Sequence, residues 1–495
     1  MHSTVFPSRS VTQPEVLKNF VGGQWVASES RQVHDVPNPA TGELFARVPL
    51  AGAADVDSAV SAAGRAYEQW RQVPVVDRAR VMFRYRDVLE KHAEDLARSV
   101  TNENGKTLDE SRGEVRRGIE VVEFACGMPT LMMGSVVEDA ARGIDSELIR
   151  VPLGVAAGIC PFNFPVMIPL WMLPIAITCG NAFVLKPSDR TPISATLLAE
   201  LLHEAGLPDG VLNIVHGAKE AVDALLSHPD VRSISFVGSA PVAKYVYQTA
   251  AAHGKRVQAL AGAKNHLVVM DDADLSKTVP AILASAFGNA GERCLAGSVV
   301  VAVGAIADSL VGRLADAASK LRIGVGWDSA TELGPVIRDS HREAIIKRIE
   351  RGVEEGAVPV CDGRQRTAQD GAHGYFMGAT VFDQVHPEMS VAQEEIFGPV
   401  LSVIRVDDLD EALQVVNGSR FGNMACIFTS SGKAAREFRS RVEAGMVGIN
   451  IGVAAPIAFF PFSGWKGSFF GDLHATGRDA VEFYTDKRVV TSRWQ

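Results

Sequence analysis

The fold is decided by residues 211–252, VLNIVHGAKEAVDALLSHPDVRSISFVGSAPVAKYVYQTAAA. Val211–Val215 and Ser233–Val237 are short apolar runs typical of buried strands, and an amphipathic helical segment follows each. The same alternation begins upstream, with strand-like runs at Gly154–Ile159 and Ala182–Leu185 and a helical segment at Thr191–Ala205. Successive strand–helix units build a parallel sheet covered by helices, so an α/β fold with a nucleotide-binding domain is predicted.

Residues 151–185 carry no charged side chain and are long enough to cross a bilayer as one helix. The segment contains five prolines, however. They would remove backbone hydrogen bonds that a single helix in lipid cannot replace. We therefore expect a buried strand, a turn, a short broken helix and a second buried strand.

The chain has 495 residues and a net charge of −9. This length exceeds one hydrophobic core, so two or three domains are expected. The negative charge disfavours nucleic acid as a partner, since phosphate binding needs a basic face, and weakly disfavours an anionic membrane. Six cysteines without a C-x-x-C pair suit a reducing compartment and predict neither disulfides nor a structural metal site. Residues 1–14 have the features of neither a secretory signal nor a transit peptide, so a cytoplasmic protein is expected.

The segment Gly288-Asn289-Ala290-Gly291-Glu292-Arg293-Cys294 places a thiol after two glycines and beside an arginine. Small neighbours leave the sulfur accessible, and an adjacent cation favours its thiolate. These conditions make a cysteine nucleophilic. We therefore predict that Cys294 is a catalytic nucleophile activated by the neighbouring positive charge.

The usual glycine-rich dinucleotide fingerprint is absent from the sequence, but two strand ends offer polar groups instead. Ser239 follows a strand and begins a helix, whose free N–H groups can hold a phosphate; alternatively, Ser239 only caps that helix. Lys186 and Asp189 follow another strand and can bind ribose hydroxyls, although an ordinary loop would have the same composition. A carboxylate there disfavours a 2′-phosphate, so NAD is predicted rather than NADP.

Three further segments each have a functional and an ordinary interpretation. Asn163, between two aromatics and two prolines, could donate its amide to an oxyanion or simply form a turn. Arg117, on the predicted helix Thr107–Phe124, could hold a substrate carboxylate or form an exposed ion pair. Glu395 and Phe397 could grip a ribose and pack on a flat ring, or only precede the strand Val400–Val406.

Five of these motifs occur in the order and spacing of the aldehyde dehydrogenase superfamily, which the chain resembles from about Asn19 to its end. They are Pro161–Pro165, Lys186-Pro187-Ser188, Phe236-Val237-Gly238-Ser239, the Cys294 motif and Glu395–Pro399. Gly262-Ala263-Lys264-Asn265-His266 and the tail Phe469–His474 are most similar to the CoA-acylating branch, the methylmalonate-semialdehyde dehydrogenases. The resemblance implies a Rossmann-type cofactor domain, an α/β catalytic domain and a small β oligomerisation element.

The implied boundaries are residues 1–128 and 148–260 for the NAD-binding domain, 261–455 for the catalytic domain, and 129–147 and 478–495 for the oligomerisation element. The restart of the strand pattern after Leu260 independently indicates a domain change there. The tail Ala480–Thr491 is predicted to be an extended strand that pairs with another subunit. A homo-oligomer is therefore expected, with a tetramer favoured.

The resemblance also implies roles for the site residues. Cys294 would attack an aldehyde, and the Asn163 amide with the Cys294 backbone N–H would stabilise the oxyanion. Arg117 and Arg293 would hold the substrate carboxylate, and no metal is implied. The residues implied for NAD are Cys160, Phe162, Lys186, Asp189, Arg190, Ser239, Ala261, Glu395 and Phe397. Three of them, Cys160, Asp189 and Ala261, differ from the residues more usual at these positions.

One difference from hydrolytic relatives affects the chemistry. Those enzymes place a glutamate four residues before the lysine that matches Lys264, whereas this chain has Leu260, which cannot accept a proton. The acyl-enzyme can then wait for the thiol of coenzyme A. The implied reaction converts methylmalonate or malonate semialdehyde to propionyl-CoA or acetyl-CoA with loss of CO2, and valine, inositol and β-alanine breakdown all fit this branch. A hydrolytic dehydrogenase that gives a free acid stays open, as does a catalytically silent binding protein.

Overall fold

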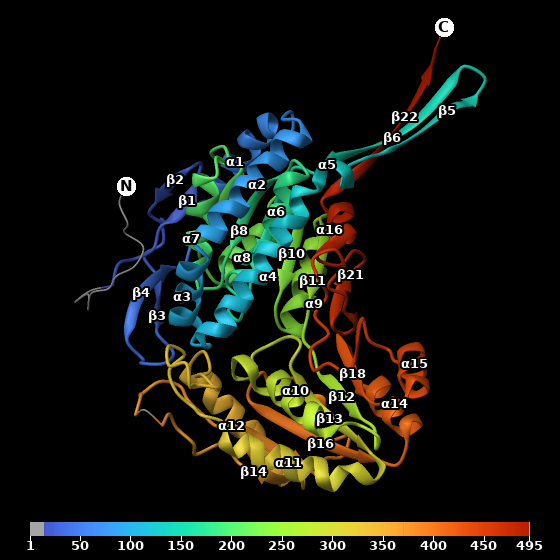
Figure 1. Cartoon of the computed structure of the whole chain (residues 1–495). Coiled ribbons are helices and arrows are strands. Elements are labelled where there is room, and N and C mark those ends of the chain that lie inside the picture. Colours follow the sequence, from blue (N-terminus) through green and yellow to red (C-terminus); the bar gives the residue numbers. More distant parts are fainter. Residues whose placement is uncertain (1–13, 370, 495) are drawn as a thin grey trace.

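The computed structural model describes residues 14–369 and 371–494. Residues 1–13, 370 and 495 lie outside the described residues. Residues 1–13 include nearly all of the segment on which the targeting prediction rests, and the predicted NAD-binding domain begins with them. The described chain forms two large sheets with their helices, one above the other in Figure 1, and an arm that projects from the upper body.

The upper body is built on an eight-stranded sheet with the order β2-β1-β9-β8-β7-β10-β11-β21. Its strands are β1 Asn19–Val21, β2 Gln24–Val26, β7 Val155–Ile159, β8 Ala182–Lys186, β9 Leu212–Ile214, β10 Val231–Val237, β11 Arg256–Leu260 and β21 Phe469–Gly471. Strands β9, β8, β7, β10 and β11 are parallel. Their chain order is 3-2-1-4-5, the arrangement of a nucleotide-binding sheet, and it reverses between β7 and β10. The predicted strand–helix units are confirmed.

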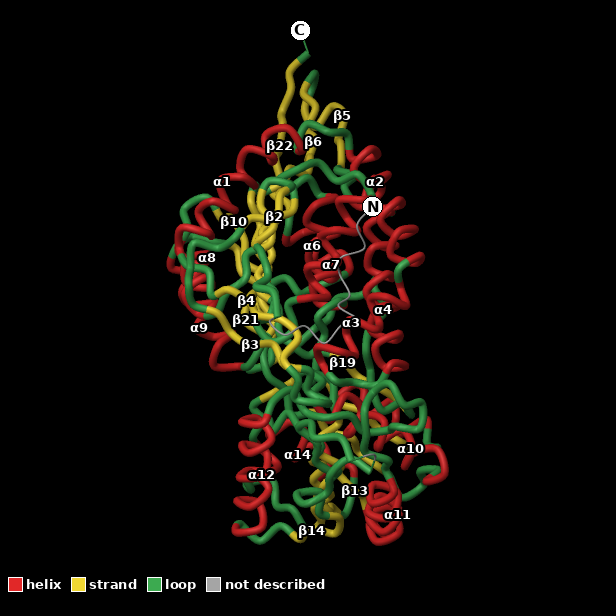
Figure 2. The backbone as a smooth tube through the Cα atoms, turned by 90° about the vertical axis from the view of Figure 1, so that its left-hand side faces the viewer, coloured by secondary structure: helices red, strands yellow, loops and turns green. Residues whose placement is uncertain are grey.

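Helices cover both faces of this sheet (Figure 2). The helices are α1 Ala53–Trp70, α2 Val75–Lys91, α3 Ala93–Asn104, α4 Leu108–Cys126, α5 Met128–Leu131, α6 Met167–Thr178, α7 Ile193–Glu204, α8 Lys219–Ser227 and α9 Ala240–Ala252. Helices α1, α8 and α9 share one apolar core with the sheet, and α2, α4, α6 and α7 pack in the core on its other face.

The uncharged segment forms β7, the helix α6 and β8, as predicted. Every residue of α6 is buried, and Pro174 lies inside it. The apolar sequence is therefore explained by burial between the sheet and its neighbouring helices. Within residues 14–369 and 371–494, no helix is both long and apolar enough to span a bilayer.

The lower body is built on a seven-stranded sheet with the order β14-β15-β16-β13-β12-β18-β19. Its strands are β12 Asn265–Val269, β13 Gly297–Val303, β14 Val358–Cys361, β15 Thr380–Asp383, β16 Val400–Val406, β18 Met424–Phe428 and β19 Met446–Ile449. Its helices are α10 Leu275–Phe287, α11 Ala307–Lys320, α12 Asp339–Glu354, α13 Ser390–Gln393, α14 Leu409–Gly418 and α15 Gly432–Arg441, with 3-10 turns at Gly288–Gly291 and Gly304–Ile306. The chain passes between the two sheets from Leu260 to Asn265, where the strand pattern restarts in the sequence.

The two bodies meet at a seam of direct backbone contacts. A Cβ atom on Gly326 would lie 2.3 Å from the carbonyl oxygen of Lys106, and one on Gly334 would lie 2.5 Å from that of Gly105. The Leu108 N–H donates to the Gly326 carbonyl at 2.9 Å. Only glycine permits backbones to approach this closely, so these positions fix how the bodies pack.

The arm is a three-stranded antiparallel sheet with the order β22-β6-β5. Its strands are β5 Ser135–Ala141, β6 Ile144–Pro152 and β22 Thr485–Arg493. Two further strand pairs belong neither to the arm nor to the two large sheets. They are β3 Val33–Pro37 with β4 Leu44–Pro49, and β17 Phe421–Gly422 with β20 Trp465–Lys466. All seven residues of β5 are exposed, so the arm has little core of its own.

The tail prediction is wrong in its first part. Residues Gly477–Phe483 form helix α16, and the strand begins only at Thr485. Ala480, Val481 and Phe483 are buried in the main core, which a helical turn permits. Within the described chain β22 pairs with β6 along one edge and leaves its other edge unpaired, so pairing with another subunit stays a prediction.

Candidate active site

The predicted site residues come from two facing edges, one in each body. Asn163 follows β7 of the upper sheet, and Cys294 lies just before β13 of the lower sheet. The Asn163 side-chain amide donates to the Glu292 carbonyl at 2.9 Å, two residues before Cys294. Residues far apart in sequence therefore meet between the carboxyl end of one sheet and the amino end of the other.

The upper edge contains the reversal point of the strand order, where parallel α/β sheets bind their ligands. Cys160 and Phe162 follow β7 and Ser239 follows β10, on the two sides of this point. The rings of Phe162 and Phe397 make an edge-to-face contact with centroids 5.9 Å apart. Two residues predicted to contact the cofactor are thus neighbours, although 235 positions separate them.

Ser239 occupies the N-cap position of the thirteen-residue helix α9, but its side chain makes no capping hydrogen bond. The interpretation of Ser239 as a helix cap alone is therefore not supported. Its hydroxyl and the helix start beside it form a combination that suits a phosphate group.

The predicted ribose site has a partner that the sequence did not reveal. Asp189 lies 2.9 Å from Nδ1 of His34, on β3, and 3.6 Å from Nε of Arg190. Burial acts to raise the Asp189 pKa, but Lys186, Arg190 and His34 outweigh it and the pKa is lowered. Lys186 is buried and donates to the Gly217 carbonyl at 2.9 Å, so it lies at the end of β8 as predicted. An ionised carboxylate at this strand end suits ribose hydroxyls.

The loop that carries Cys294 has a strained backbone. Asn289 and Ala290 have φ values of 52° and 51°, and Gly291 has 74°. A Cβ on Gly291 would lie 2.1 Å from the Gly398 carbonyl oxygen, so glycine is required there. The carbonyl of Cys294 accepts hydrogen bonds from the Asn265 and Asn423 amides, both at 2.9 Å. These contacts fix the loop where the strand β13 begins.

The neighbouring Arg293 lowers the pKa of the Cys294 thiol as expected, but larger effects outweigh it, so the cation does not activate the thiol in this structure. The Arg293 guanidinium forms an ion pair with Glu110 at 2.8 Å. Burial and the nearby Glu395 carboxyl raise the pKa of the Cys294 thiol to about 12, against smaller opposing effects of backbone N–H groups and Arg293. The side chain of Cys294 is partly exposed, yet its thiol is protonated at neutral pH.

Glu395 lies against the segment that joins the two sheets. Its Oε1 accepts a hydrogen bond from the Ala263 N–H at 2.9 Å, and a Cβ on Gly262 would lie 2.6 Å from its Oε2. Burial raises the pKa of Glu395 despite an opposing effect of Lys264. Ala261, predicted to lie beside the cofactor, is buried, and its N–H donates to the Ser468 carbonyl at 2.9 Å.

Leu260 is the last residue of β11 and is buried, with 4% of its surface exposed. Lys264, four positions later, is also buried, and burial lowers its pKa to about 7. Its Nζ atom has no hydrogen-bond partner among the described residues. The position where hydrolytic relatives carry a base is therefore apolar and buried in this chain.

Arg117 lies on α4 and is about one-third exposed, and its Nη2 donates to the Pro456 carbonyl. Glu120 lies 3.9 Å from its Nε, too far for a strong pair. Arg116, in contrast, is held by Glu90 and Glu123 at the surface. Of the two adjacent arginines, Arg117 thus retains donor groups that could take a carboxylate.

Sequence reasoning missed several residues that hold the site together. Glu110 binds the cysteine loop, Lys106 and Glu114 hold the Asn163 segment, and His34 faces Asp189. A lysine or glutamate on an amphipathic helix is usually solvated, so composition gives no signal for such burial. The unusual pattern Gly105-Lys106-Thr107, between two helices, was the one available hint.

The chain matches the family model described as "Aldehyde dehydrogenase family" over residues 25–490. It is 61% identical to malonate-semialdehyde dehydrogenase 3 of Geobacillus kaustophilus over 485 residues, which cover 98% of this chain and 100% of that protein. Malonate-semialdehyde dehydrogenase 2 of Geobacillus thermodenitrificans is also 61% identical, with the same coverage of both chains.

Two solved structures are similar along almost the whole chain. Methylmalonate-semialdehyde dehydrogenase from Oceanimonas doudoroffii has a TM-score of 0.95 at 50% identity and covers 97% of this chain and 99% of its own. A Sinorhizobium meliloti structure that carries the same enzyme name, complexed with NAD, has a TM-score of 0.96 at 45% identity, with coverage of 98% and 99%. The predicted overall fold is confirmed by these similarities.

Proposed function

The chain belongs to the aldehyde dehydrogenase family, and from this premise we propose that it is an NAD-dependent, CoA-acylating semialdehyde dehydrogenase. Its substrates would be malonate and methylmalonate semialdehyde, and its products acetyl-CoA or propionyl-CoA with CO2. The names of the relatives, at up to 61% identity, support the substrate class. The apolar residue Leu260 is the observation that carries CoA acylation.

In the proposed first step, the Cys294 thiol gives up its proton to solvent, and the resulting thiolate attacks the aldehyde carbon to form a thiohemiacetal. The developing oxyanion would accept hydrogen bonds from the Asn163 amide and the Cys294 backbone N–H. Preorganised donors of this kind stabilise such an oxyanion strongly in a site that excludes water. Asn163 is buried and already directed at the cysteine loop through its bond to Glu292, which supports this role.

NAD, when bound, supplies the hydride acceptor that turns the thiohemiacetal into a Cys294 thioester. Around it, this chain would bind phosphate at Ser239 and ribose at Lys186 and Asp189. Phe397, in contact with Phe162, would pack beside the nicotinamide ring. We propose NAD rather than NADP because the ionised Asp189 would repel a 2′-phosphate, which the lowered pKa of this carboxyl supports.

The thioester would be resolved by coenzyme A. The CoA thiolate attacks the acyl carbon, the acyl group moves to CoA, and Cys294 leaves as a thiolate. The β-carboxylate departs as CO2, its bonding pair forms an enolate stabilised by the thioester carbonyl, and a proton from solvent completes the acyl group. Arg117 would hold the carboxylate on entry. Arg293 can contribute only if its pair with Glu110 opens.

A hydrolytic route is the second candidate, and one observation favours it. Glu395 lies close enough to Cys294 to raise the thiol pKa, and its own pKa is raised. A carboxylate with a raised pKa is a better general base than an ordinary glutamate. If Glu395 activated water, the product would be a free acid.

The deciding experiment measures NADH formation and product identity with CoA present or omitted, across a panel of semialdehydes. Under the proposed function, turnover depends on CoA and the products are acyl-CoA and CO2. Free acid formed at the full rate without CoA would establish the hydrolytic route. Cys294→Ser is the control, because both routes require the thiol.

We also propose that the chain forms a homo-oligomer, with a tetramer favoured, and that it acts in the cytoplasm. The exposed arm, whose outer strand β22 has one free edge within the described chain, supports assembly. Six free cysteines are compatible with a reducing compartment. Sedimentation of the purified protein would test the oligomeric state directly.

A further inference from the structure

Helix α4 presents one face to the site, and that face carries Glu110, Glu114 and Arg117. The spacing i, i+4 and i+7 places three side chains in a single stripe along a helix. Each of the three contacts a different part of the site. Arg117 contacts the loop at Pro456, as described above, and the two glutamates contact the oxyanion and nucleophile segments.

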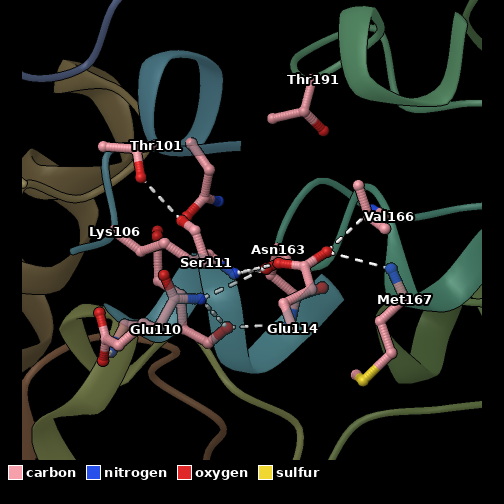
Figure 3. A network of polar contacts seen from close by, with 12 residues as sticks. Thr101, Lys106, Glu110, Ser111, Glu114, Asn163, Val166, Met167 and Thr191 are labelled. Atoms are coloured by element: carbon pink, nitrogen blue, oxygen red, sulfur yellow. Dashed lines mark hydrogen bonds and ion pairs between the residues drawn. The ribbon is translucent and has the colours of Figure 1, made fainter. Parts of the chain in front are cut away.

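Glu114 holds the segment that carries Asn163 (Figure 3). Its Oε1 accepts hydrogen bonds from the N–H groups of Val166 and Met167, at 2.8 and 3.1 Å. Its Oε2 pairs with Lys106 at 2.8 Å, and Lys106 donates in turn to the Asn163 backbone carbonyl at 2.6 Å. The Lys106 and Glu114 side chains are 1% and 0% exposed, so water does not compete for these contacts.

Glu110 holds the cysteine loop in the same way, one helical turn earlier. Its Oε1 accepts from the Asn289 N–H at 2.7 Å and from Nη2 of Arg293 at 2.8 Å. Asn289 and Ala290 are non-glycine residues in the left-handed region, a conformation that persists only when surrounding contacts enforce it. Glu110 supplies one such contact at the first strained residue.

The two glutamates therefore fix both sides of one hydrogen bond. The Asn163 amide and the Asn289 amide both donate to the Glu292 carbonyl, at 2.9 and 3.2 Å. Glu114 determines where the Asn163 segment lies, and Glu110 determines where the cysteine loop lies. Because both belong to one rigid helix, the separation of oxyanion donor and nucleophile is fixed by one turn of α4.

We propose that Glu110 and Glu114 are positioning residues that hold Asn163 and the Cys294 loop in register for attack on the aldehyde. This rests on the proposed use of Cys294 as the nucleophile, but it is independent of whether CoA or water resolves the thioester. Neither glutamate touches the substrate. Their effect is to keep the oxyanion donor and the sulfur at the distance that the transition state needs.

The test measures the first-turnover burst of NADH, which requires only Cys294 and the oxyanion site and no acyl acceptor. Glu110→Gln keeps the size of the side chain and removes its charge. We expect it to slow the burst by about tenfold or more, since hydrogen bonds to charged groups are the strong ones, while KM for NAD changes less than about twofold. Glu123→Gln, on the exposed part of α4, is the matched control and should burst at the wild-type rate.

A double-mutant comparison separates positioning from general damage. If Glu110 acts through the Asn163 alignment, adding Glu110→Gln to Asn163→Ala should slow the burst little beyond Asn163→Ala alone. Glu110→Asp, which keeps the charge but shortens its reach, should also be slow, and its melting temperature reports separately the loss of the hydrogen bond from the Thr107 N–H to Oε2 at the start of α4. A wild-type burst in Glu110→Asp and Glu110→Gln, or fully multiplicative losses in the double variant, would overturn the proposal. Absence of a burst in the wild-type protein would instead refute the proposed function.

Discussion

The protonation state of Cys294 leads to a specific prediction about Glu395. Burial and the Glu395 carboxyl raise the thiol pKa to about 12, so at pH 9 the thiolate is roughly one part in a thousand. Glu395→Gln removes a negative charge that disfavours the thiolate. The thiol pKa should therefore fall, and a change of about one unit, or about 1.4 kcal/mol, is reasonable for a like charge in a buried site.

A fall of one unit raises the thiolate fraction about tenfold at pH 9, but each thiolate becomes roughly threefold less nucleophilic as its pKa falls. The net expectation is an alkylation rate about threefold faster. The assay follows carbamidomethylation of Cys294 by iodoacetamide, quantified by peptide mass spectrometry between pH 7 and 10. The other five cysteines are buried, so labelling at Cys294 is readily distinguished.

Glu394→Gln is the matched control, because Glu394 is an adjacent carboxylate that pairs with Arg351 at 3.0 Å. It should leave the pH profile of alkylation unchanged. Equal rates and equal profiles for Glu395→Gln and the wild-type protein would show that Glu395 does not govern the thiol. Saturating NAD should act in the same direction as Glu395→Gln if the cofactor's ribose takes the carboxylate away from the sulfur.

Four further outcomes are expected. Arg117→Ala should raise KM for a carboxylated aldehyde about ten- to a hundredfold more than KM for propanal, and equal effects in steady-state kinetics would mean that the arginine is structural. Leu260→Glu should produce free acid without CoA, increasingly as pH rises and the buried carboxyl ionises, whereas product analysis of Leu260→Gln should show none. Asp189→Ala should weaken NAD binding and reduce the preference over NADP, measured as the ratio of kcat/KM values; an unchanged ratio would exclude Asp189 from the ribose site. Lys106→Met should lower the free energy of unfolding in urea by about 3 kcal/mol, because it leaves Glu114 buried and unpaired; a loss below about 1 kcal/mol would contradict this.

The sequence predicted the parts of the fold that follow from alternating apolar runs. The strand–helix units around β8, β9 and β10 were correctly anticipated, and so was a helix between two buried strands in the uncharged segment, although α6 is continuous rather than broken. The motifs Pro161–Pro165 and Glu395–Pro399 were also informative, because their residues Phe162 and Phe397 lie in contact. The tail was misjudged because a short apolar run can be a strand or a helix, and only packing against α6 decides between them.

The electrostatics of the site could not be predicted in this way. Adjacency in sequence suggested that Arg293 would activate Cys294, but the arginine pairs with Glu110, 183 positions away. Likewise, the pairing of His34 with Asp189 and the proximity of Glu395 to the thiol depend on how distant loops pack. No periodicity or local motif records such contacts, so charge partners must be read from the three-dimensional structure.

The backbone contacts among Gly105, Lys106, Gly326 and Gly334 limit how far the two bodies can move relative to each other. At this seam carbonyl oxygens lie directly against glycine Cα atoms, so no side chain stands between the two backbones there to absorb a hinge motion. The Leu108 amide, bonded across this junction, should therefore exchange its hydrogen slowly, through openings that separate the two bodies.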